Sequence, residues 1–358
     1  MSEPRLIVIL GPTAGGKSDL AVELALKLRS SVVTDAEIPR RCAHDAEIIS
    51  ADSMQVYRHL NIGTAKPTPA DRSRVKHHLI DVMDPTVRFT VYDWVQSAEA
   101  IVRDLLERGA WPIVVGGTNL YIKALLQGLF EGPEADEPFR QSLEGVPGVQ
   151  LHQRLREVDP IAADRINPQD TKRLTRALEV FRLTGRPITG LQTQWEYSSK
   201  SPLPADLPTG EGDAAETGCY RFEPILIGLD WPAELINRRI NQRVKAMFYP
   251  DQVEAELAAQ YCRSAENLPQ EVQRLTEGGL LGPQAREALG YKQISQHLEG
   301  QCTLEEAFEA TKIQTRRFAK QQRTWLRRFR GVHWLKAATL SLDQCAVASM
   351  NIVRSVKC

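Results

Sequence analysis

The feature that most constrains this chain is an octapeptide near its start, Gly11-Pro12-Thr13-Ala14-Gly15-Gly16-Lys17-Ser18. It matches the phosphate-loop pattern G-x-x-x-x-G-K-[ST] and lies between an aliphatic run that predicts a strand (5–10) and a segment with Leu every four residues that predicts a helix (19–28). In that setting backbone N–H groups and the positive end of the helix dipole face phosphate oxygens. We therefore predict that the octapeptide binds a chain of phosphates, with Lys17 as a point charge and the Ser18 hydroxyl as a ligand of Mg²⁺.

Further strand candidates alternate with helical segments along the chain. They are the aliphatic runs 47–51, 112–115 and 224–229, and an amphipathic helix is predicted over 95–105. This alternation predicts an α/β fold, a P-loop NTPase-like parallel sheet flanked by helices. In such sheets ligands bind beyond the carboxyl ends of the strands.

A change of character in the middle of the chain predicts an inserted helical domain. Residues 139–190 show helical periodicity without strand candidates, and 198–218 is rich in Ser, Pro, Gly and acidic residues, which is typical of a mobile loop. We therefore expect three regions: a core that carries the phosphate loop and a C-terminal basic helix (1–137 and 222–330), a helical insertion (138–221) and a C-terminal tail (331–358).

Composition excludes several classes of protein. Lys and Arg total 45 and Asp and Glu total 45, so the net charge of +0 argues against a protein that coats nucleic acid, although a local basic face is still compatible with it. No apolar run reaches the roughly 18 residues of a membrane span, so we expect no membrane association and a cytoplasmic location. The six cysteines lack zinc-finger or disulfide-framework spacing.

The adjacent His77 and His78 lack a third ligand at a useful spacing for a metal site, and we interpret them as structural.

Asp52 follows the second predicted strand, so its carboxylate is expected beside the phosphate loop. Three roles are open for it. An acid at this place can bind Mg²⁺, it can accept a proton from an attacking nucleophile, or it can cap a turn.

The glycines of Gly116-Gly117-Thr118 follow the next core strand at the same edge of the sheet. They permit close backbone approach, and Thr118 offers a hydroxyl to a substrate. A plain turn capped by Thr118 is the alternative.

A long helix is predicted over 303–329, which contains no Pro or Gly. At 100° per residue its positive side chains fall within an arc of about 80°, roughly opposite an apolar stripe. They are Lys312, Arg316, Lys320, Arg323, Arg327 and Arg330. We expect this face to contact phosphates of a nucleic acid, with a solvated or acid-paired face as the alternative. Trp325 lies on the apolar stripe and is expected to pack in the core, with stacking on a base as the alternative.

Eight motifs together resemble one family, the tRNA dimethylallyltransferases, also called tRNA isopentenyltransferases. They are GPTAGGKS (11–18), DSMQVY (52–57), GTAKP (63–67), HHLIDV (77–82), GGTNLY (116–121), KRLTRALEVF (172–181), ALGYKQ (288–293) and TRRFAKQQRTWLRR (315–328). The resemblance covers most of the chain, and the motifs occur in the order of the family.

The resemblance implies transfer of a dimethylallyl group from dimethylallyl diphosphate to N6 of the adenosine just 3′ of the anticodon. The phosphate loop then holds the leaving diphosphate with Mg²⁺, and Arg239 adds to that site. By the same carry-over Asp52 is the general base, and Thr118 lies near the diphosphate and the amine. The resemblance also assigns residues to tRNA, with a surface ion pair as the alternative for Arg140 and for the segment 286–291. The assigned residues are Asp52, Ser53, Met54, Gln55, Thr118, Arg140, Lys172, Arg173, Leu174, Thr175, Arg176, Arg286, Tyr291, Lys312, Arg316, Lys320, Arg323 and Arg327.

Two other functions are compatible with a phosphate loop. One is a kinase of a small metabolite, which would bind ATP at residues 11–18 and would have little use for the basic helix. The other is an RNA-binding NTPase switch without enzymatic transfer. Under the preferred reading the partners are the tRNA anticodon stem-loop and dimethylallyl diphosphate, and we expect the chain to act as a monomer.

Overall fold

The computed structural model describes residues 5–34, 45–130, 132–191, 220–262 and 266–356. The chain divides into two compact units, one of residues Met1–Leu126 with Gly210–Cys358 and one of residues Gln127–Thr209. The second unit begins and ends earlier than the insertion expected at 138–221. The loop expected at 198–218 lies outside the described residues.

The larger unit is built on one parallel sheet of six strands in the order β3-β2-β4-β1-β5-β6. The predicted α/β class with a parallel sheet is confirmed. Four strands coincide with the predicted runs, whereas β3 and β6 were not expected. The bounds are β1 Ile7–Leu10, β2 Ala46–Ser50, β3 His77–His78, β4 Trp111–Val115, β5 Ile225–Asp230 and β6 Val332–Lys336.

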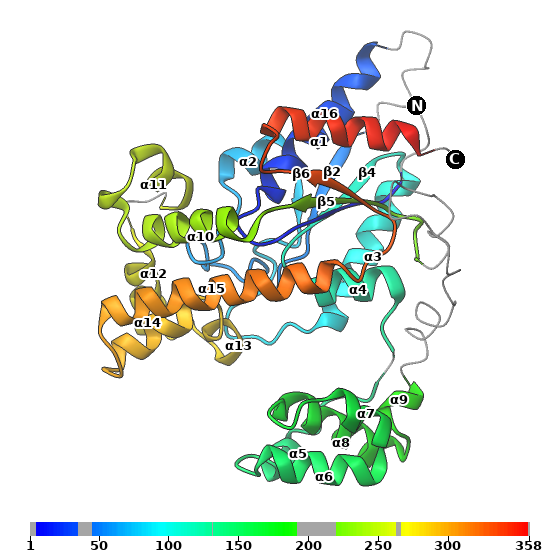
Figure 1. Ribbon diagram of the computed structural model, residues 1–358, viewed down its shortest axis with the longest axis vertical. Helices are drawn as coiled ribbons and strands as arrows, with labels where there is room; N and C mark the ends of the chain where they lie inside the picture. Colours follow the sequence, from blue (N-terminus) through cyan, green and yellow to red (C-terminus); the bar gives the residue numbers. More distant parts are fainter. Residues whose placement is uncertain (1–4, 35–44, 131, 192–219, 263–265, 357–358) are drawn as a thin grey trace. The chain divides into compact units, whose positions relative to one another are not determined.

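Helices cover the two faces of this sheet, with α1 and α16 on one side and α3, α4 and α15 on the other (Figure 1). Side-chain caps mark several helix starts, such as the reciprocal capping boxes at Thr90 of α3 and Thr303 of α15. The bounds in this unit are α1 Lys17–Thr34, α2 Pro69–Arg74, α3 Val91–Glu107, α4 Asn119–Gln127, α10 Ala233–Phe248, η4 Pro250–Gln252, α11 Ala255–Tyr261, α12 Leu268–Glu277, α13 Pro283–Arg286, α14 Tyr291–Leu298, α15 Leu304–Leu326 and α16 Leu342–Ser355.

A hydrophobic core lies between the sheet and the helices α1 and α16. Ile7 and Ile9 of β1 pack with Leu24 of α1 and with Met350 of α16, all buried. The expected tail 331–358 is therefore part of the core, since it supplies the edge strand β6 and the helix α16. Because β1, β2 and β4 are parallel neighbours, the loops after them open at one edge of the sheet.

In the smaller unit, all regular elements of the described residues are helices. Its helices are α5 Glu137–Ser142, α6 Gly148–Val158, α7 Pro160–Arg165, α8 Thr171–Thr184 and α9 Ile188–Leu191. Apolar side chains at helical spacing form its core, among them Leu151 and Leu155 of α6 and Leu174 and Leu178 of α8.

Candidate active site

The phosphate loop connects β1 to α1, and the helix begins at Lys17. The loop closes on itself, because the Gly15 N–H donates to the Pro12 carbonyl at 3.1 Å and Lys17 Nζ donates to the same oxygen at 2.7 Å. Gly16 has a φ of +81°, a conformation that favours glycine. Lys17 is buried, while Ser18 is exposed in the mouth of the loop. Burial, and then the charge of Arg243, lower the pKa of Lys17 to about 7, although Asp52 acts in the opposite direction.

Helix α10 supports the loop from the side. Arg239 Nε donates to the Ala14 carbonyl at 2.8 Å, and Arg243 Nη2 donates to Thr13 Oγ1 at 2.8 Å. The structure thus brings Arg239 to the loop, where the resemblance placed it. Arg243 was missed, although the i,i+4 spacing of the two arginines puts both on one face of a helix. The Nε atom of Arg243 is buried and has no hydrogen-bond partner among the described residues.

Asp52 combines a turn role with a place in the site. Its Oδ1 accepts N–H groups from Met54 at 2.9 Å and Gln55 at 3.3 Å, as a turn carboxylate does. Its Oδ2 lies on the other side, 3.7 Å from the position that a Cβ on Gly117 would take. One oxygen therefore fixes the loop while the other faces the loop after β4.

The loop after β4 approaches β2 closely. A Cβ on Gly116 would lie 2.1 Å from the carbonyl oxygen of Ala51, so only glycine fits there. The Thr118 hydroxyl accepts the Ser53 N–H at 2.9 Å and lies 3.2 Å from Ser53 Oγ. Thr118 thus ties its own loop to the Asp52 loop.

These loops enclose one pocket of about 280 Å³ in the larger unit. As predicted, the residues that follow β1, β2 and β4 meet there. Ser53, Met54 and Thr118 are not among its lining residues. The lining includes Thr13, Ala14, Gly15, Gly16, Lys17, Ser18, Asp52, Gln55, Gly116, Gly117, Arg239, Arg243 and Gln322.

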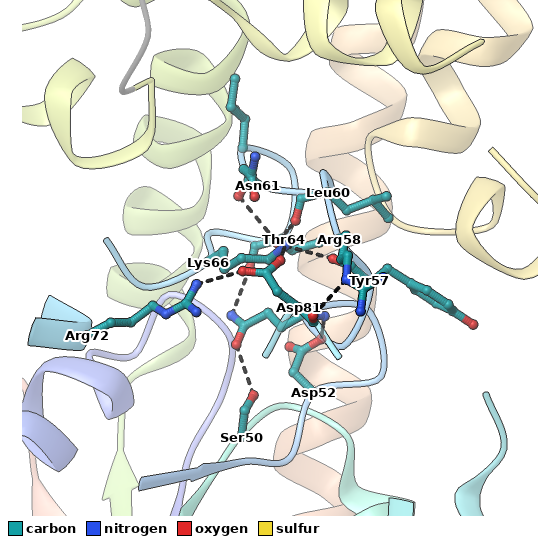
Figure 2. A network of polar contacts seen from close by, with 12 residues as sticks. Ser50, Asp52, Tyr57, Arg58, Leu60, Asn61, Thr64, Lys66, Arg72 and Asp81 are labelled. Carbon is teal, nitrogen blue, oxygen red and sulfur yellow. Dashed lines mark hydrogen bonds and ion pairs between the residues drawn. The ribbon is translucent and has the colours of Figure 1, made fainter. Parts of the chain in front are cut away.

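Gln55 is buried, and both ends of its amide bond to the protein. Its Oε1 accepts from the Ser50 hydroxyl at 3.0 Å, and its Nε2 donates to the Thr64 carbonyl at 3.1 Å. These bonds belong to the polar network of Figure 2. The Gln55 amide can therefore contact a base only if it gives up these two hydrogen bonds. The sequence did not indicate that the amide has these partners.

The same network contains a buried ammonium group (Figure 2). Lys66 Nζ donates to the Tyr57 carbonyl at 2.7 Å and to Asp81 Oδ1 at 2.6 Å, and Arg72 donates to Asp81 Oδ2 at 2.6 Å. Lys66, in the GTAKP motif, thereby holds the loop that follows Asp52 against the segment that follows β3. We assign it to the support of the site.

The basic face of α15 divides into two parts. Lys312 pairs with Glu309 at 2.6 Å, and Arg316 donates to Asn241 at 2.8 Å, so both are held by the protein. Lys320, Arg323 and Arg327 have no carboxylate partner in the described part of the chain. The acid-paired alternative therefore applies to Lys312, because Glu309 lies one turn before it on the same helix.

The basic cluster of the helical unit surrounds a buried acid. Glu179 accepts from Arg140 Nε at 2.7 Å and from Arg176 Nη1 at 2.5 Å, so the ion-pair alternative holds for Arg140 and applies to Arg176 as well. The Leu174 side chain is buried in the core of the unit, which corrects its assignment to tRNA contact. Lys172 and Arg173 are exposed, and Thr175 is half-buried.

Two further assignments change in the segment 286–291. Arg286 forms an ion pair with Glu299. Tyr291 is fully buried and its hydroxyl donates to Glu271 at 2.5 Å, which corrects its assignment to RNA contact. Sequence periodicity did not show this, because the segment is short.

His77 and His78 lie at an edge of the sheet, and their structural role stays a prediction. They form β3, and His78 Nε2 lies 2.5 Å from the buried carboxylate of Glu47. Within the described ranges no group of three or more His, Cys, Asp or Glu side chains is arranged to hold a metal ion. No helix in those ranges is long and apolar enough to cross a membrane.

Comparison with known proteins gives consistent matches. The family model described as IPP transferase matches residues 55–329. A tRNA dimethylallyltransferase of Geobacter sulfurreducens is 38% identical over 340 residues, covering 94% of this chain and 93% of the relative. One of Pelotomaculum thermopropionicum is 38% identical over 355 residues, covering 98% and 95%.

Solved structures agree with these matches. The tRNA delta(2)-isopentenylpyrophosphate transferase of Staphylococcus epidermidis is 30% identical with a TM-score of 0.62, covering 99% of this chain and 100% of that one. The tRNA isopentenylpyrophosphate transferase of Bacillus halodurans is 31% identical with a TM-score of 0.62, covering 98% and 96%. A eukaryotic dimethylallyltransferase acting on tRNA, 23% identical with a TM-score of 0.69, shares the fold.

Proposed function

Because this chain belongs to the IPP transferase family, and is a prenyltransferase enzyme that transfers a dimethylallyl group to tRNA, we propose that its phosphate loop holds the diphosphate of the donor. The donor is dimethylallyl diphosphate, and the acceptor is N6 of the adenosine next to the anticodon on its 3′ side. The kinase alternative is not favoured, since the relatives named above are transferases acting on tRNA.

The observation that supports the proposal is a group of cations at the pocket that lie near the carboxylates of Asp19 and Asp52 but form no ion pair with them. Lys17, Arg239 and Arg243 lie at the phosphate loop, and none forms an ion pair with a carboxylate of the described residues. Positive charge that is partly buried and unpaired is costly unless an anion joins it. A diphosphate in this pocket would supply that anion and would favour the charged form of Lys17.

In the proposed reaction the N6 amine attacks the allylic carbon, a C–N bond forms, and the C–O bond to the diphosphate breaks. Negative charge grows on the diphosphate as that bond breaks. Backbone N–H groups of the phosphate loop, Lys17 and Arg243 then stabilise charge that is larger in the transition state than in the bound donor.

The amine must also lose a proton. Asp52 is proposed as the base, because its Oδ1 is fixed by two backbone N–H groups while Oδ2 faces Gly117 at the pocket wall. Thr118, held by Ser53, positions the neighbouring loop.

Mg²⁺ is proposed as the cofactor. The residues fit a metal that is bound mainly by the diphosphate, because Ser18 is exposed at the start of α1 and offers one hydroxyl ligand. When bound, the metal neutralises charge on the diphosphate.

The proposed tRNA contacts are exposed or half-exposed basic side chains. Lys320 and Arg323 on α15, Arg327 just after it and Lys172 on α8 form no ion pair with the described residues, whereas Arg173 on α8 is exposed and pairs with Asp170 at 3.2 Å. Such contacts position the RNA backbone, while the target base leaves its stack to reach the pocket. All these groups belong to one chain, so the reaction requires only a monomer.

The experiment is transfer of label from dimethylallyl-labelled dimethylallyl diphosphate to tRNA, followed by nucleoside analysis of an anticodon stem-loop. We expect label on N6 of the adenosine 3′ of the anticodon and one diphosphate released per transfer. An Asp52→Asn variant should lose most turnover while it keeps its affinity for tRNA. Label on another nucleoside would contradict the proposed acceptor, and unchanged turnover in the variant would remove Asp52 as the base.

A further inference from the structure

Gln322 is a buried polar residue in the middle of the basic helix α15. Its side chain is 2% exposed, and it lies on the packed face of the helix, although its sequence neighbours include the two tRNA candidates Lys320 and Arg323. It lines the donor pocket. A glutamine in such a place needs partners for both ends of its amide.

Both partners belong to the walls of the pocket. Gln322 Oε1 accepts the backbone N–H of Thr13 at 2.8 Å, and Gln322 Nε2 donates to the carbonyl of Gly117 at 2.8 Å. Thr13 belongs to the phosphate loop, and Gly117 immediately precedes Thr118. One side chain therefore joins the diphosphate side of the pocket to the side where the amine is activated.

The fit around this bridge is close. A Cβ on Gly117 would lie 2.9 Å from Gln322 Nε2, so the glycine leaves the space that the amide fills. Thr13 is also held by its side chain, because Arg243 donates to its hydroxyl at 2.8 Å. Movement of Gln322 would thus move the phosphate loop and the Gly117 loop relative to each other.

We propose that Gln322 is a positioning residue that sets the separation between the leaving diphosphate and the acceptor side of the pocket. The proposal rests on the function proposed above and names a residue that the sequence motifs did not assign. In-line attack depends on this separation, and a displacement of about 1 Å can cost on the order of 100-fold in rate. The loss should therefore appear mainly in kcat, with a smaller change in KM for the donor.

Gln322→Met tests the bridge, since methionine keeps the approximate volume but cannot make either hydrogen bond. We expect kcat to fall about 10- to 100-fold, with donor KM changed less than kcat and with near wild-type tRNA affinity. Gln321→Met is the matched control, because Gln321 is the exposed neighbour of the same type on the same helix. Its kinetics should match those of the wild type.

Gln322→Glu adds a readout that a merely structural role would not give. A protonated carboxyl has the shape of the amide: its carbonyl oxygen can accept from Thr13, and its hydroxyl can donate to Gly117. A carboxylate can make only the first bond. The kcat of this variant relative to wild type should therefore recover as pH falls, whereas Gln321→Glu should show a constant ratio.

The outcomes separate this proposal from the proposed function. If wild-type protein prenylates tRNA but Gln322→Met keeps kcat within about twofold, or Gln322→Glu shows no recovery at low pH, the bridge does not position the reaction. A lower kcat could also come from partial unfolding. A single-turnover experiment with labelled donor separates the two causes, because it measures both the fraction of active molecules and the rate per active molecule. A reduced active fraction with a normal single-turnover rate would also overturn the proposal. If wild-type protein transfers no label, the function itself fails.

Discussion

Replacement of Glu179 tests how the helical unit is stabilised. This carboxylate is fully buried and accepts hydrogen bonds from Arg140, Arg176 and the backbone N–H of Asp136. Burial acts to raise its pKa, but the hydrogen bonds from Arg140, Arg176 and Asp136 outweigh burial and hold the pKa below its ordinary value. Glu179→Ala leaves two arginines facing each other without an acid between them.

The expected loss of folding free energy in Glu179→Ala depends on how exposed the two arginine partners of Glu179 are. Removal of one member of a buried ion pair costs about 3–5 kcal/mol, and we take the lower end because the Arg140 and Arg176 side chains are 23% and 32% exposed to screening solvent. About 3 kcal/mol lowers the equilibrium constant for folding roughly 150-fold at 1.36 kcal/mol per factor of ten. A unit of about 80 residues has a stability of about 4–12 kcal/mol, so the variant should approach the folding threshold.

Hydrogen exchange of the full-length protein can measure this loss separately in each unit. We expect faster exchange of amides in α6 and α8 and unchanged exchange in β1 and β4. Glu137→Gln is the control, because Glu137 is a more exposed partner of the same Arg140, at 3.5 Å, and should cost less than about 1 kcal/mol. Unchanged protection of α8 in Glu179→Ala would refute the reasoning.

Three further perturbations have definite expected outcomes. Lys320→Ala should lower the slope of log affinity for tRNA against log salt concentration by about 0.7–0.9, as measured by filter binding. Lys312→Ala should change this slope less, because the ammonium of Lys312 pairs with Glu309. Equal slopes for the two variants would contradict the distinction between paired and unpaired cations on α15. The pKa of Lys17 is lowered to about 7, and a bound diphosphate favours its charged ammonium form. The diphosphate affinity of the wild type, divided by that of Lys17→Met, should therefore fall as the pH rises above about 7. A pH-independent ratio of the two affinities in calorimetry would contradict this expectation. Gly116→Ala should lower the melting temperature, since its Cβ would meet the Ala51 carbonyl at 2.1 Å and overpacking costs about 1–3 kcal/mol; an unchanged melting temperature would show that the loop can relax.

Strong local patterns carried the prediction of the fold. The phosphate loop and three aliphatic runs located four strands and one edge of the sheet. The two-residue strand β3 and the strand β6 were missed, because a pair of histidines and the half-polar run Val332–Lys336 give little periodicity. Tertiary pairing at the sheet edges, and not local propensity, forms these strands.

The site was predicted less completely, because hydrogen bonds between distant segments decide it. The strand pattern placed Asp52 at the phosphate loop and the resemblance added Arg239, but nothing in the local sequence showed that Gln322 reaches the backbone of Thr13, 309 positions away. Basic residues were assigned to RNA by their position on a helix face or by the resemblance, neither of which shows whether an acid from another segment pairs with them. The structure then separated Arg140, which has a buried acid beside it, from Lys320, which has none among the described residues.

The central claim is that the phosphate loop holds the leaving diphosphate of a prenyl donor. The most direct measurement is calorimetric binding of inorganic diphosphate with Mg²⁺ to the wild type and to Lys17→Met, combined with competition against dimethylallyl diphosphate in the label-transfer assay. The account predicts one site per chain, competition between diphosphate and the donor, and weaker binding in the variant at unchanged tRNA affinity. Equal diphosphate affinity in the two proteins, or diphosphate that does not compete with the donor, would contradict it.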